Sequence, residues 1–354
     1  MNILASELKR TLKKLAPVKA ETYQIGEHGI SAQDASEVWV VLESPLSELK
    51  QTFNFSGKKF SSVINRMSGE IDITVDGNKL VLKSYKAKVE LEIRAVSRTT
   101  FPSPASKYVS FKSSDLKSAL AVASASASPK KGEAYGGAVL LQSLPVPLEV
   151  EKPSGYRVVG SDGFVITIVK RNQELPFEFK YQLNLTAAAI VQLMDEDVVE
   201  IGETATHLIV KSGADTIYAA KAVLAYPAFD KLIVAQHPVT IQFSPEKWAP
   251  ALRTVETLIE EEKDSGNISL QFKDGNVAFR TVGVGSTASD EAEYEQLTPD
   301  PVFDAKEFAM KVKARYLSGF LAKAGEKATI GVTSSKKPIT YESGQIMAIT
   351  TPSE

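Results

Sequence analysis

The chain has 354 residues, of which 43% are apolar and 24% are charged, and its formal net charge is −2. This length suggests two or three globular domains, and the absence of cysteine excludes disulfide frameworks, thiolate metal sites and cysteine nucleophiles. The first residues lack the layout of a signal peptide, and no apolar run approaches the roughly 20 residues of a membrane-spanning helix, so we expect a soluble cytoplasmic protein without a membrane partner.

An amphipathic helix is predicted to open each third of the chain. In the first third, Leu8, Leu12 and Leu15 recur at helical spacing, with basic residues on the opposite face. The segments 111–120 and 243–252 repeat this pattern, each with a serine as the predicted N-cap. The three segments therefore read as copies of one starting element.

A second helix is predicted later in each third. Apolar residues at the 3.6-residue spacing place these helices over 57–67, 185–195 and 304–324. Each helix is followed by alternating apolar and polar residues, which is typical of antiparallel strands. The predicted strands are 70–75 and 79–82 about an Asp-Gly turn, 198–210 and 216–223 about a turn at 212–215, 328–332 and 339–349, and a separate Asp-Gly hairpin over 268–279.

An aromatic–proline pair closes two of the thirds, Phe101-Pro102 and Tyr226-Pro227. With the helices and strands, these pairs indicate three duplicated α+β domains, each with two helices and antiparallel sheets. We place the domains at 1–107, 108–235 and 236–354.

The sequence contains no pattern that points to catalysis. The histidines, three in all, lie in different thirds without metal-ligand spacing, and neither a P-loop nor a G-x-G-x-x-G motif is present. We therefore expect no enzyme, no catalytic residue, no bound metal and no cofactor.

The three-fold layout, the segment 156–164 and the segment 225–229 resemble bacterial-type DNA polymerase processivity clamps, the sliding-clamp β subunit of DNA polymerase III, including a version encoded by a phage. The resemblance implies three tandem repeats of the DNA-clamp fold that form a ring by head-to-tail homodimerisation. Such a ring encircles duplex DNA without reading its sequence, is opened by a clamp-loader ATPase, and tethers a DNA polymerase and other replication or repair proteins. The resemblance also implies that the protein is located in the bacterial cytoplasm or nucleoid, or in the host cytoplasm if a phage encodes it.

A ring of this kind needs basic helix faces that contact phosphates and leave the bases unread. The basic residues on the polar faces of the predicted helices are Arg10, Lys13, Lys14, Lys58, Lys59, Lys117, Arg253, Lys306 and Lys313. For any one of them, an ordinary solvated helix face is an equally good interpretation.

The resemblance also implies a dimer interface between two oppositely charged edges. A predicted first-domain strand over 83–91 is basic, the segment 289–295 is acidic, and opposite charges on exposed edges direct pairing. The implied interface residues are Lys83, Lys86, Lys88, Val89, Leu91, Leu258, Ile259, Glu291, Glu293 and Glu295. The alternative is a pair of charged edges that only prevent aggregation.

A partner-peptide pocket between the middle and last domains is the third implied site. Apolar walls with a methionine suit a short hydrophobic peptide. The residues carried over are Ser161, Gly163, Phe164, Val165, Ile166, Pro227, Leu232, Met347 and Ile349. Ordinary core packing is the competing interpretation, above all for Ile166 and Leu232.

Two other functions fit parts of the sequence. A non-catalytic structural or scaffold protein built from repeats would explain the duplicated domains but not the basic helix faces. An enzyme with an unfamiliar site would require titratable groups that converge in a pocket.

Overall fold

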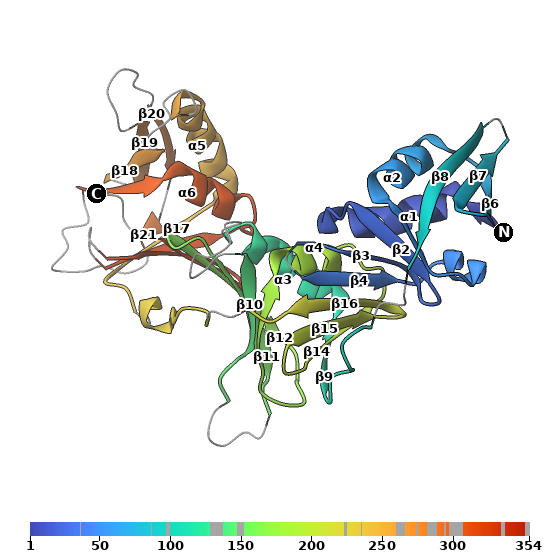
Figure 1. Ribbon diagram of the computed structural model, residues 1–354. Helices are drawn as coiled ribbons and strands as arrows, with labels where there is room; N and C mark the ends of the chain where they lie inside the picture. Colours follow the sequence, from blue (N-terminus) through green and yellow to red (C-terminus); the bar gives the residue numbers. More distant parts are fainter. Residues whose placement is uncertain are drawn as a thin grey trace. The chain divides into compact units, whose positions relative to one another are not determined.

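The computed structural model describes residues 1–35, 37–85, 87–96, 100–127, 137–146, 152–222, 225–234, 236–259, 266–273, 275–281, 289–293, 295–296, 307–333 and 337–350. The chain divides into two compact units (Figure 1). Unit 1 consists of Met1–Ala121, Pro145–Ser154 and Glu174–Val223, and unit 2 consists of Val122–Leu144, Gly155–Gln173 and Leu224–Glu354. The predicted middle domain, 108–235, thus contributes to both units, and the predicted domain boundaries stay a prediction.

Unit 1 contains most of the N-terminal half of the chain. Its helices are α1 (Ala5–Leu15), η1 (Ala16–Val18), η2 (Pro45–Leu49), α2 (Gly57–Arg66) and α4 (Leu185–Val191). Its strands are β1 (Asn2–Leu4), β2 (Thr22–Gly26), β3 (Gly29–Gln33), β4 (Val38–Leu42), β5 (Phe53–Ser56), β6 (Glu70–Asp76), β7 (Lys79–Ser84), β8 (Ala87–Ala95), β9 (Tyr108–Lys112), β13 (Lys180–Asn184), β14 (Val198–Glu203), β15 (His207–Ser212) and β16 (Asp215–Ala220). Helix α3 (Ser113–Ser124) has residues in both units.

One antiparallel sheet organises unit 1. Its 12 strands follow the order β1-β6-β7-β8-β5-β2-β3-β4-β16-β15-β14-β9. Strand β4 pairs with β16 in the register Val40 with Ile217 and Trp39 with Tyr218. This pair joins strands from the predicted first and middle domains into one continuous surface.

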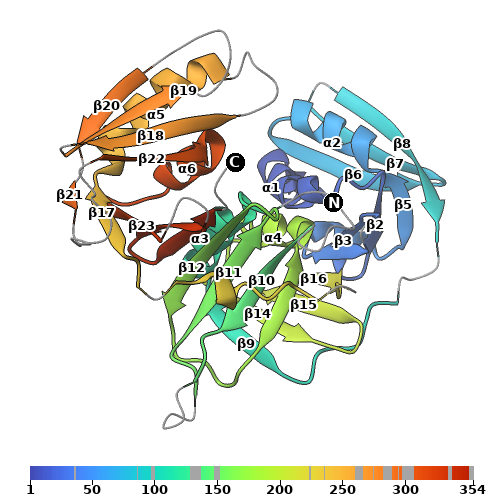
Figure 2. The same cartoon turned by 90° about the vertical axis from the view of Figure 1, so that its left-hand side faces the viewer.

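The core of unit 1 lies under α1 and α2, which pack side by side (Figure 2). Leu8 and Leu12 of α1, and Phe60 and Ile64 of α2, are buried, as their helical spacing predicts. The ring of Phe60 lies 4.9 Å from that of Phe55 on β5, so α2 covers the sheet face that carries Phe55. Burial of an aromatic side chain of this size contributes about 2 kcal/mol.

Unit 2 contains the remaining elements. Its helices are η3 (Asp230–Leu232), α5 (Pro245–Ile259) and α6 (Ala314–Leu321). Its strands are β10 (Ala138–Ser143), β11 (Gly155–Ser161), β12 (Val165–Asn172), β17 (Val239–Phe243), β18 (Asn267–Lys273), β19 (Asn276–Thr281), β20 (Ser289–Glu293), β21 (Glu295–Gln296), β22 (Glu307–Lys313), β23 (Ala328–Val332), β24 (Ile339–Ser343) and β25 (Ile346–Thr350). Strands β10-β11-β12-β25-β24-β23-β17-β21 form one sheet in this order, and β20-β19-β18-β22 form another.

Trp248 on α5 anchors the core of unit 2. Its ring is fully buried, stacks on Phe243 with centroids 3.9 Å apart, and meets Phe279 edge-on at 5.3 Å. Helix α5 begins directly after Ser244, whose carbonyl oxygen accepts the amide of Trp248. Aromatic pairs in these geometries add to the free energy that area burial provides.

The described elements repeat one order, a strand, a helix and three further strands. The order occurs as β1-α1-β2-β3-β4, β5-α2-β6-β7-β8, β9-α3-β10-β11-β12, β13-α4-β14-β15-β16, β17-α5-β18-β19-β20 and β22-α6-β23-β24-β25, with short 3-10 turns and β21 between these elements. The chain is therefore a mixed helix-and-sheet protein with large antiparallel sheets.

Four local predictions were wrong in detail. The segment predicted as one helix over 304–324 contains strand β22 and then α6, because Phe308, Met310 and Val312 alternate with period two. The strand predicted over 198–210 is two strands, β14 and β15, and the strand predicted over 339–349 is also two strands, β24 and β25. The strand predicted over 83–91 is the end of β7, a turn and β8, with Lys83 opposite Lys88.

Among the described residues, no helix is long and apolar enough to cross a membrane.

Candidate functional site

The junction of β12 with β25 in unit 2 presents an apolar face. Ile166 lies opposite Ile349, and Ile168 lies opposite Met347. Paired residues of an antiparallel ladder share one face of the sheet. Around them a cluster of mostly aliphatic side chains forms, with Leu140, Val159, Ile166, Ile168, Tyr226, Phe229 and Ile349 buried and with Ile233 and Met347 partly buried against it.

The aromatic–proline segment closes this cluster. Tyr226 is buried and donates its hydroxyl proton to the carbonyl oxygen of Val159 at 3.3 Å. Arg157, only 6% exposed, donates to Asp230 at 2.7 Å and to Gln142 at 3.0 Å, and its guanidinium lies 4.7 Å from the ring centre of Phe229. These contacts hold the segment that begins at Tyr226 against the sheet.

The predicted pocket residues fall into two groups. Ile166, Met347 and Ile349 belong to this apolar cluster, and half-buried Pro227 follows Tyr226 directly. Leu232 on η3 is 37% exposed. Sequence reasoning missed Val159, Ile168 and Phe229, although Ile166 and Ile168 already share the period of two that marks one face of a strand.

The second group lines a cavity on the opposite sheet face. Val165 and Thr167 alternate with the cluster residues along β12, and with exposed Phe164 they line a space of about 450 Å³. Ser161 donates its hydroxyl proton to the carbonyl oxygen of Val165 and accepts the amide of Gly163, so both stabilise the turn that presents Phe164. Because strand residues alternate between faces, one strand cannot supply all the predicted residues to one pocket.

Two cationic side chains lie close to the turn that carries Phe164. The Lys313 ammonium lies 5.0 Å from the centre of the Phe164 ring, and Arg315 is 3.5 Å from Asp162. The Tyr316 hydroxyl donates to Asp162 at 2.9 Å. Burial and the hydrogen bond to Asp162 raise the pKa of Tyr316, so the hydroxyl stays a donor.

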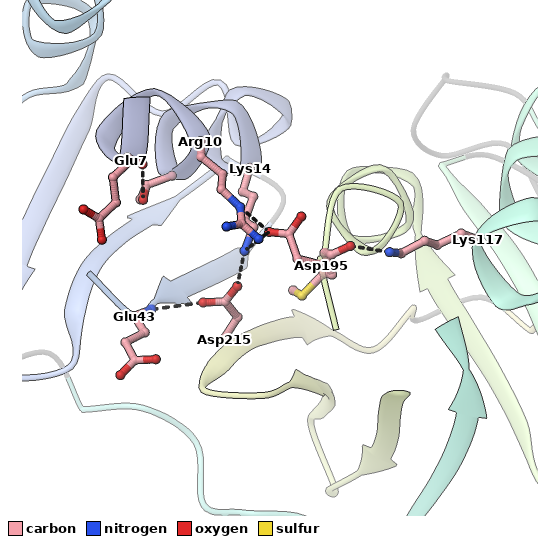
Figure 3. A network of polar contacts seen from close by, with 9 residues as sticks. Glu7, Arg10, Lys14, Glu43, Lys117, Asp195 and Asp215 are labelled. Carbon is pink, nitrogen blue, oxygen red and sulfur yellow. Dashed lines mark hydrogen bonds and ion pairs between the residues drawn. The ribbon is translucent and has the colours of Figure 1, made fainter. Parts of the chain in front are cut away.

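A polar network in unit 1 holds three of the predicted DNA-facing cations (Figure 3). The Lys14 ammonium lies 2.7 Å from Asp215 and 2.9 Å from Asp195, and Arg10 is 2.8 Å from Asp195. Lys117 donates to the carbonyl oxygen of Met194. The network ties α1 to the segment that follows α4 and to the first residue of β16, more than 180 residues away in sequence.

This network shifts the pKa values of Asp195 and Lys14. Burial alone would raise the pKa of Asp195, but hydrogen bonds from Lys14 and Arg10 outweigh it and lower that pKa. For Lys14, burial acts to lower the pKa, and the bonds to Asp215 and Asp195 raise it. Both groups are therefore charged at neutral pH.

The other predicted DNA-facing cations differ in their surroundings. Lys13 on α1, Lys58 and Lys59 on α2, and Arg253 on α5 are exposed. Among the residues that the structure describes, none of these four has a carboxylate within ion-pair distance. Lys313 ends a strand and is not on a helix as predicted, and Lys306 lies outside the described residues.

Most of the predicted interface residues lie on strand β8 or near strand β20, whereas Lys83 lies on β7, and Leu258 and Ile259 end helix α5. Over Ala87–Glu92 strand β8 pairs with β7 on one side, and its pairing with β5 covers only Ile93–Ala95. Strand β20 is the outermost described strand of its sheet, with Glu291 and Glu293 exposed.

Side chains along these edges already form ion pairs. Lys88 pairs with Glu90 at 2.7 Å, and Lys247 pairs with Glu293 at 2.6 Å. Ile259 packs in part against the unit 2 core. Lys86 and the side chains of Leu258 and Glu295 lie outside the described residues, and Leu91 is buried while Val89 is half-buried.

Within the described part of the chain, no group of three or more His, Asp or Glu side chains is placed to hold a metal ion.

Solved structures of known proteins share this fold over the whole chain. The DNA polymerase III β subunit from Thermotoga maritima matches with a TM-score of 0.85 and 13% identity, covering 100% of this chain and 98% of its own. A sliding clamp from Pseudomonas aeruginosa bound to griselimycin matches with a TM-score of 0.82 and 15% identity, covering 100% and 99%. A Helicobacter pylori β clamp bound to a DNA ligase peptide matches with a TM-score of 0.81 and 14% identity, again over 100% and 99%.

No protein-family model matches the chain, and no curated protein matches it in sequence. The structural likeness extends across both units, and it confirms the fold that the sequence resemblance implied: this chain has the fold of the DNA polymerase III β-subunit sliding clamp.

Proposed function

We propose that this protein is a DNA polymerase processivity factor, a ring-shaped and non-catalytic sliding clamp that encircles duplex DNA. The observation that carries the proposal is the full-length match to solved clamps, with TM-scores of 0.80 to 0.85. The six-fold recurrence of a strand, a helix and three strands supports three tandem clamp repeats of two such units each. The proposed repeats keep the boundaries 1–107, 108–235 and 236–354.

Exposed cations are the proposed contacts to DNA. Lys13, Lys58, Lys59 and Arg253 carry charges that no described carboxylate neutralises, so they can replace counterions at phosphates. Arg10 forms an ion pair with Asp195, and Lys14 forms one with Asp215. These two cations are therefore proposed to contribute less to DNA binding. A few weak phosphate contacts suit a ring that must slide.

Ring closure is proposed to pair the β8 edge of one copy with the β20 edge of another. Lys88 on β8 and Lys83 opposite it on β7 supply basic side chains at the first edge, and Glu291 and Glu293 supply acidic ones at the second. Backbone groups along two open edges can form a continuous ladder. Changing Lys83→Glu with Lys88→Glu should weaken the dimer in analytical ultracentrifugation, and an unchanged dimer constant would remove this interface.

Partner proteins are proposed to dock on the apolar cluster at the β12–β25 junction. The Helicobacter pylori clamp was solved with a DNA ligase peptide, which supports peptide docking on this fold. Partly buried Met347 can adapt to a hydrophobic side chain. The proposed partners are a DNA polymerase, other replication and repair proteins and a clamp-loader ATPase, in a bacterial cytoplasm or nucleoid or, for a phage protein, in the host cytoplasm.

The experiment that tests the function compares nicked circular DNA with the same DNA after linearisation. The protein is loaded by a clamp-loader ATPase and separated from free protein by gel filtration. Retention on circles and loss from linear ends means topological linkage, as a clamp requires. Equal retention on both forms that falls steeply with salt means ordinary electrostatic binding and would contradict the proposal.

A further inference from the structure

Unit 1 contains a second junction built like the one at β12–β25. Strands β4 and β12 are each the last strand of one strand–helix–three-strand repeat. Strand β4 pairs antiparallel with β16, and β12 pairs antiparallel with β25, which are the last strands of two other repeats. The aromatic–proline pair recurs here as well. Phe101 stacks on Tyr218 with centroids 5.3 Å apart and meets Trp39 edge-on at 6.1 Å.

The side chains beside Phe101 line a cavity on the sheet face away from α2. Gln24 lies opposite both Asn54 and Ser31, and Gln33 lies opposite Trp39, so these residues share a face. Together with Phe101 they border a space of about 560 Å³. The neighbouring residues Tyr23 and Phe55 point to the other face, where Phe60 of α2 covers Phe55.

Two residues that border this cavity each carry a buried polar atom with unmet hydrogen-bonding capacity. The indole Nε1–H of Trp39 and the Oδ1 of Asn54 are shielded from solvent, and neither has a hydrogen-bond partner among the described residues. Buried polar groups are nearly always paired, because losing water without a replacement partner is unfavourable. One atom is a donor and the other an acceptor, and a peptide amide supplies both complements.

We propose that this cavity, bordered by Trp39, Asn54 and Phe101, is a second peptide-binding site that takes an extended, uncharged segment with one aromatic side chain. When the side chains of Trp39 and Asn54 turn toward the segment, Trp39 donates to a backbone carbonyl and Asn54 accepts a backbone N–H, while Phe101 packs against the aromatic ring.

The dimensions of the sheet set the length of the bound segment. Asn54 on β5 and Trp39 on β4 are separated by three strand spacings, about 14 Å, which four extended residues span. The described charged residues of the lining are Lys19, Glu21 and Asp34, and Asp34 accepts the amide of Val38 at 2.9 Å. A single cation beside two carboxylates does not suit a nucleic-acid backbone, which favours a neutral peptide.

The test uses the full-length protein labelled with nitrogen-15 at its tryptophans. The probe is the capped peptide acetyl-Ser-Ser-Phe-Ser-Ser-amide, and the readout is the indole N–H signal in two-dimensional NMR spectra. The chain has only Trp39 and Trp248, and the Trp248 indole already donates to the carbonyl oxygen of Glu293 at 3.0 Å. Trp248 is therefore an internal reference.

We expect a saturable shift of the Trp39 signal at peptide concentrations of about 1 mM, while the Trp248 signal stays in place. The matched peptide with alanine in place of phenylalanine should give no saturable shift. Asn54→Leu keeps the size of the side chain but loses the acceptor, and it should weaken binding about fivefold. Phe101→Ala should weaken binding further, and Met347→Ala in unit 2 should leave it unchanged.

A Trp39 signal that does not move, or that moves equally with both peptides, would overturn the proposal. So would binding that survives both Asn54→Leu and Phe101→Ala. If Met347→Ala alone abolished the shift, the peptide would be acting through the β12–β25 cluster. Retention on circular DNA is measured independently, so failure of this site and failure of the clamp function are distinguishable.

Discussion

The two sheet junctions have a similar backbone arrangement but different linings. At β12–β25 in unit 2, Ile166, Ile168 and Met347 form an aliphatic face under buried Tyr226. At β4–β16 in unit 1, the corresponding face carries Trp39, Tyr218 and half-exposed Phe101, with polar neighbours. Strand pairing sets the shape of such a site, and the side chains that alternate onto one face decide which ligand it can hold.

The largest expected effect comes from removing the aromatic ring at each junction. Tyr226 is 6% exposed, and Tyr226→Ala should lower the free energy of unfolding by about 3–4 kcal/mol. Phe101→Ala should lower it by about 1–2 kcal/mol, because Phe101 is only half-buried. Denaturant unfolding checks this order, and equal losses would mean that the two junctions are equally packed.

A glycine on β11 allows the end of α3 to pack closely against the sheet of the unit 2 junction. A Cβ on Gly160 of β11 would lie 1.9 Å from the carbonyl oxygen of Ala123 at the end of α3, so Gly160→Ala must shift backbone and should cost about 2–3 kcal/mol. Gly319→Ala on α6 is the matched control, since nothing lies within 4 Å of its Cβ. This control should be neutral or stabilising by about 0.5–1 kcal/mol, and a similar loss in both variants would refute the close approach.

In unit 1, a charge network adds to the apolar packing of α1. Lys14→Met leaves Asp215 and Asp195 without their shared ammonium, and it should cost about 1–2 kcal/mol of unfolding free energy. Lys13→Met, one residue away and exposed, should change it by less than about 0.5 kcal/mol. Thermal unfolding of the two variants separates the roles, and equal behaviour would mean that the network adds nothing.

The same network predicts a pH window. The pKa of Asp195 is lowered in the folded state, so its contribution is complete above its ordinary pKa of 3.8 and is lost as the pH falls further. The pKa of Lys14 is raised, so its contribution is complete below 10.5 and is lost as the pH rises beyond that value. The stability difference between the unmodified protein and Lys14→Met should therefore be flat across neutral pH and shrink at both extremes.

The smallest effect is expected from single cations among those proposed to contact DNA. Lys58→Gln with Lys59→Gln should reduce the salt dependence of DNA binding by about one unit of slope per lysine, because each exposed lysine releases counterions on its own. Arg10→Gln should change the slope less, since Arg10 is paired with Asp195. Filter binding over a salt series measures both, and equal slopes would mean that the ion pair opens on DNA.

Much of the local structure could be predicted from the sequence. The helix over 57–67 and the Asp-Gly hairpin that follows it lie within a residue or two of the predicted bounds, because period and turn chemistry are local signals. The helix predicted over 304–324 was wrong at its start. Phe308 and Val312 are four residues apart, a spacing that fits both a helix face and a strand face, and the packing of β22 on β18 selects the strand.

The candidate sites could be predicted only in part. Ile166, Met347 and Ile349 come together in the apolar cluster, whereas Phe164 and Val165 line a cavity on the other face of the sheet. The alternation along β12 separates Val165 from Ile166, but only the packing of the Tyr226 segment against one face of the sheet decides which face holds the cluster.

By itself, the sequence determined the helices, the strands and the duplicated pattern that resembles a clamp, since these depend on spacings of a few residues. Only the tertiary structure decided which cations remain exposed. Lys14 and Lys13 are neighbours on one helix, yet one meets Asp195 and Asp215 and the other faces solvent. Contacts between segments about 200 residues apart depend on the tertiary fold, and a local sequence pattern cannot predict them.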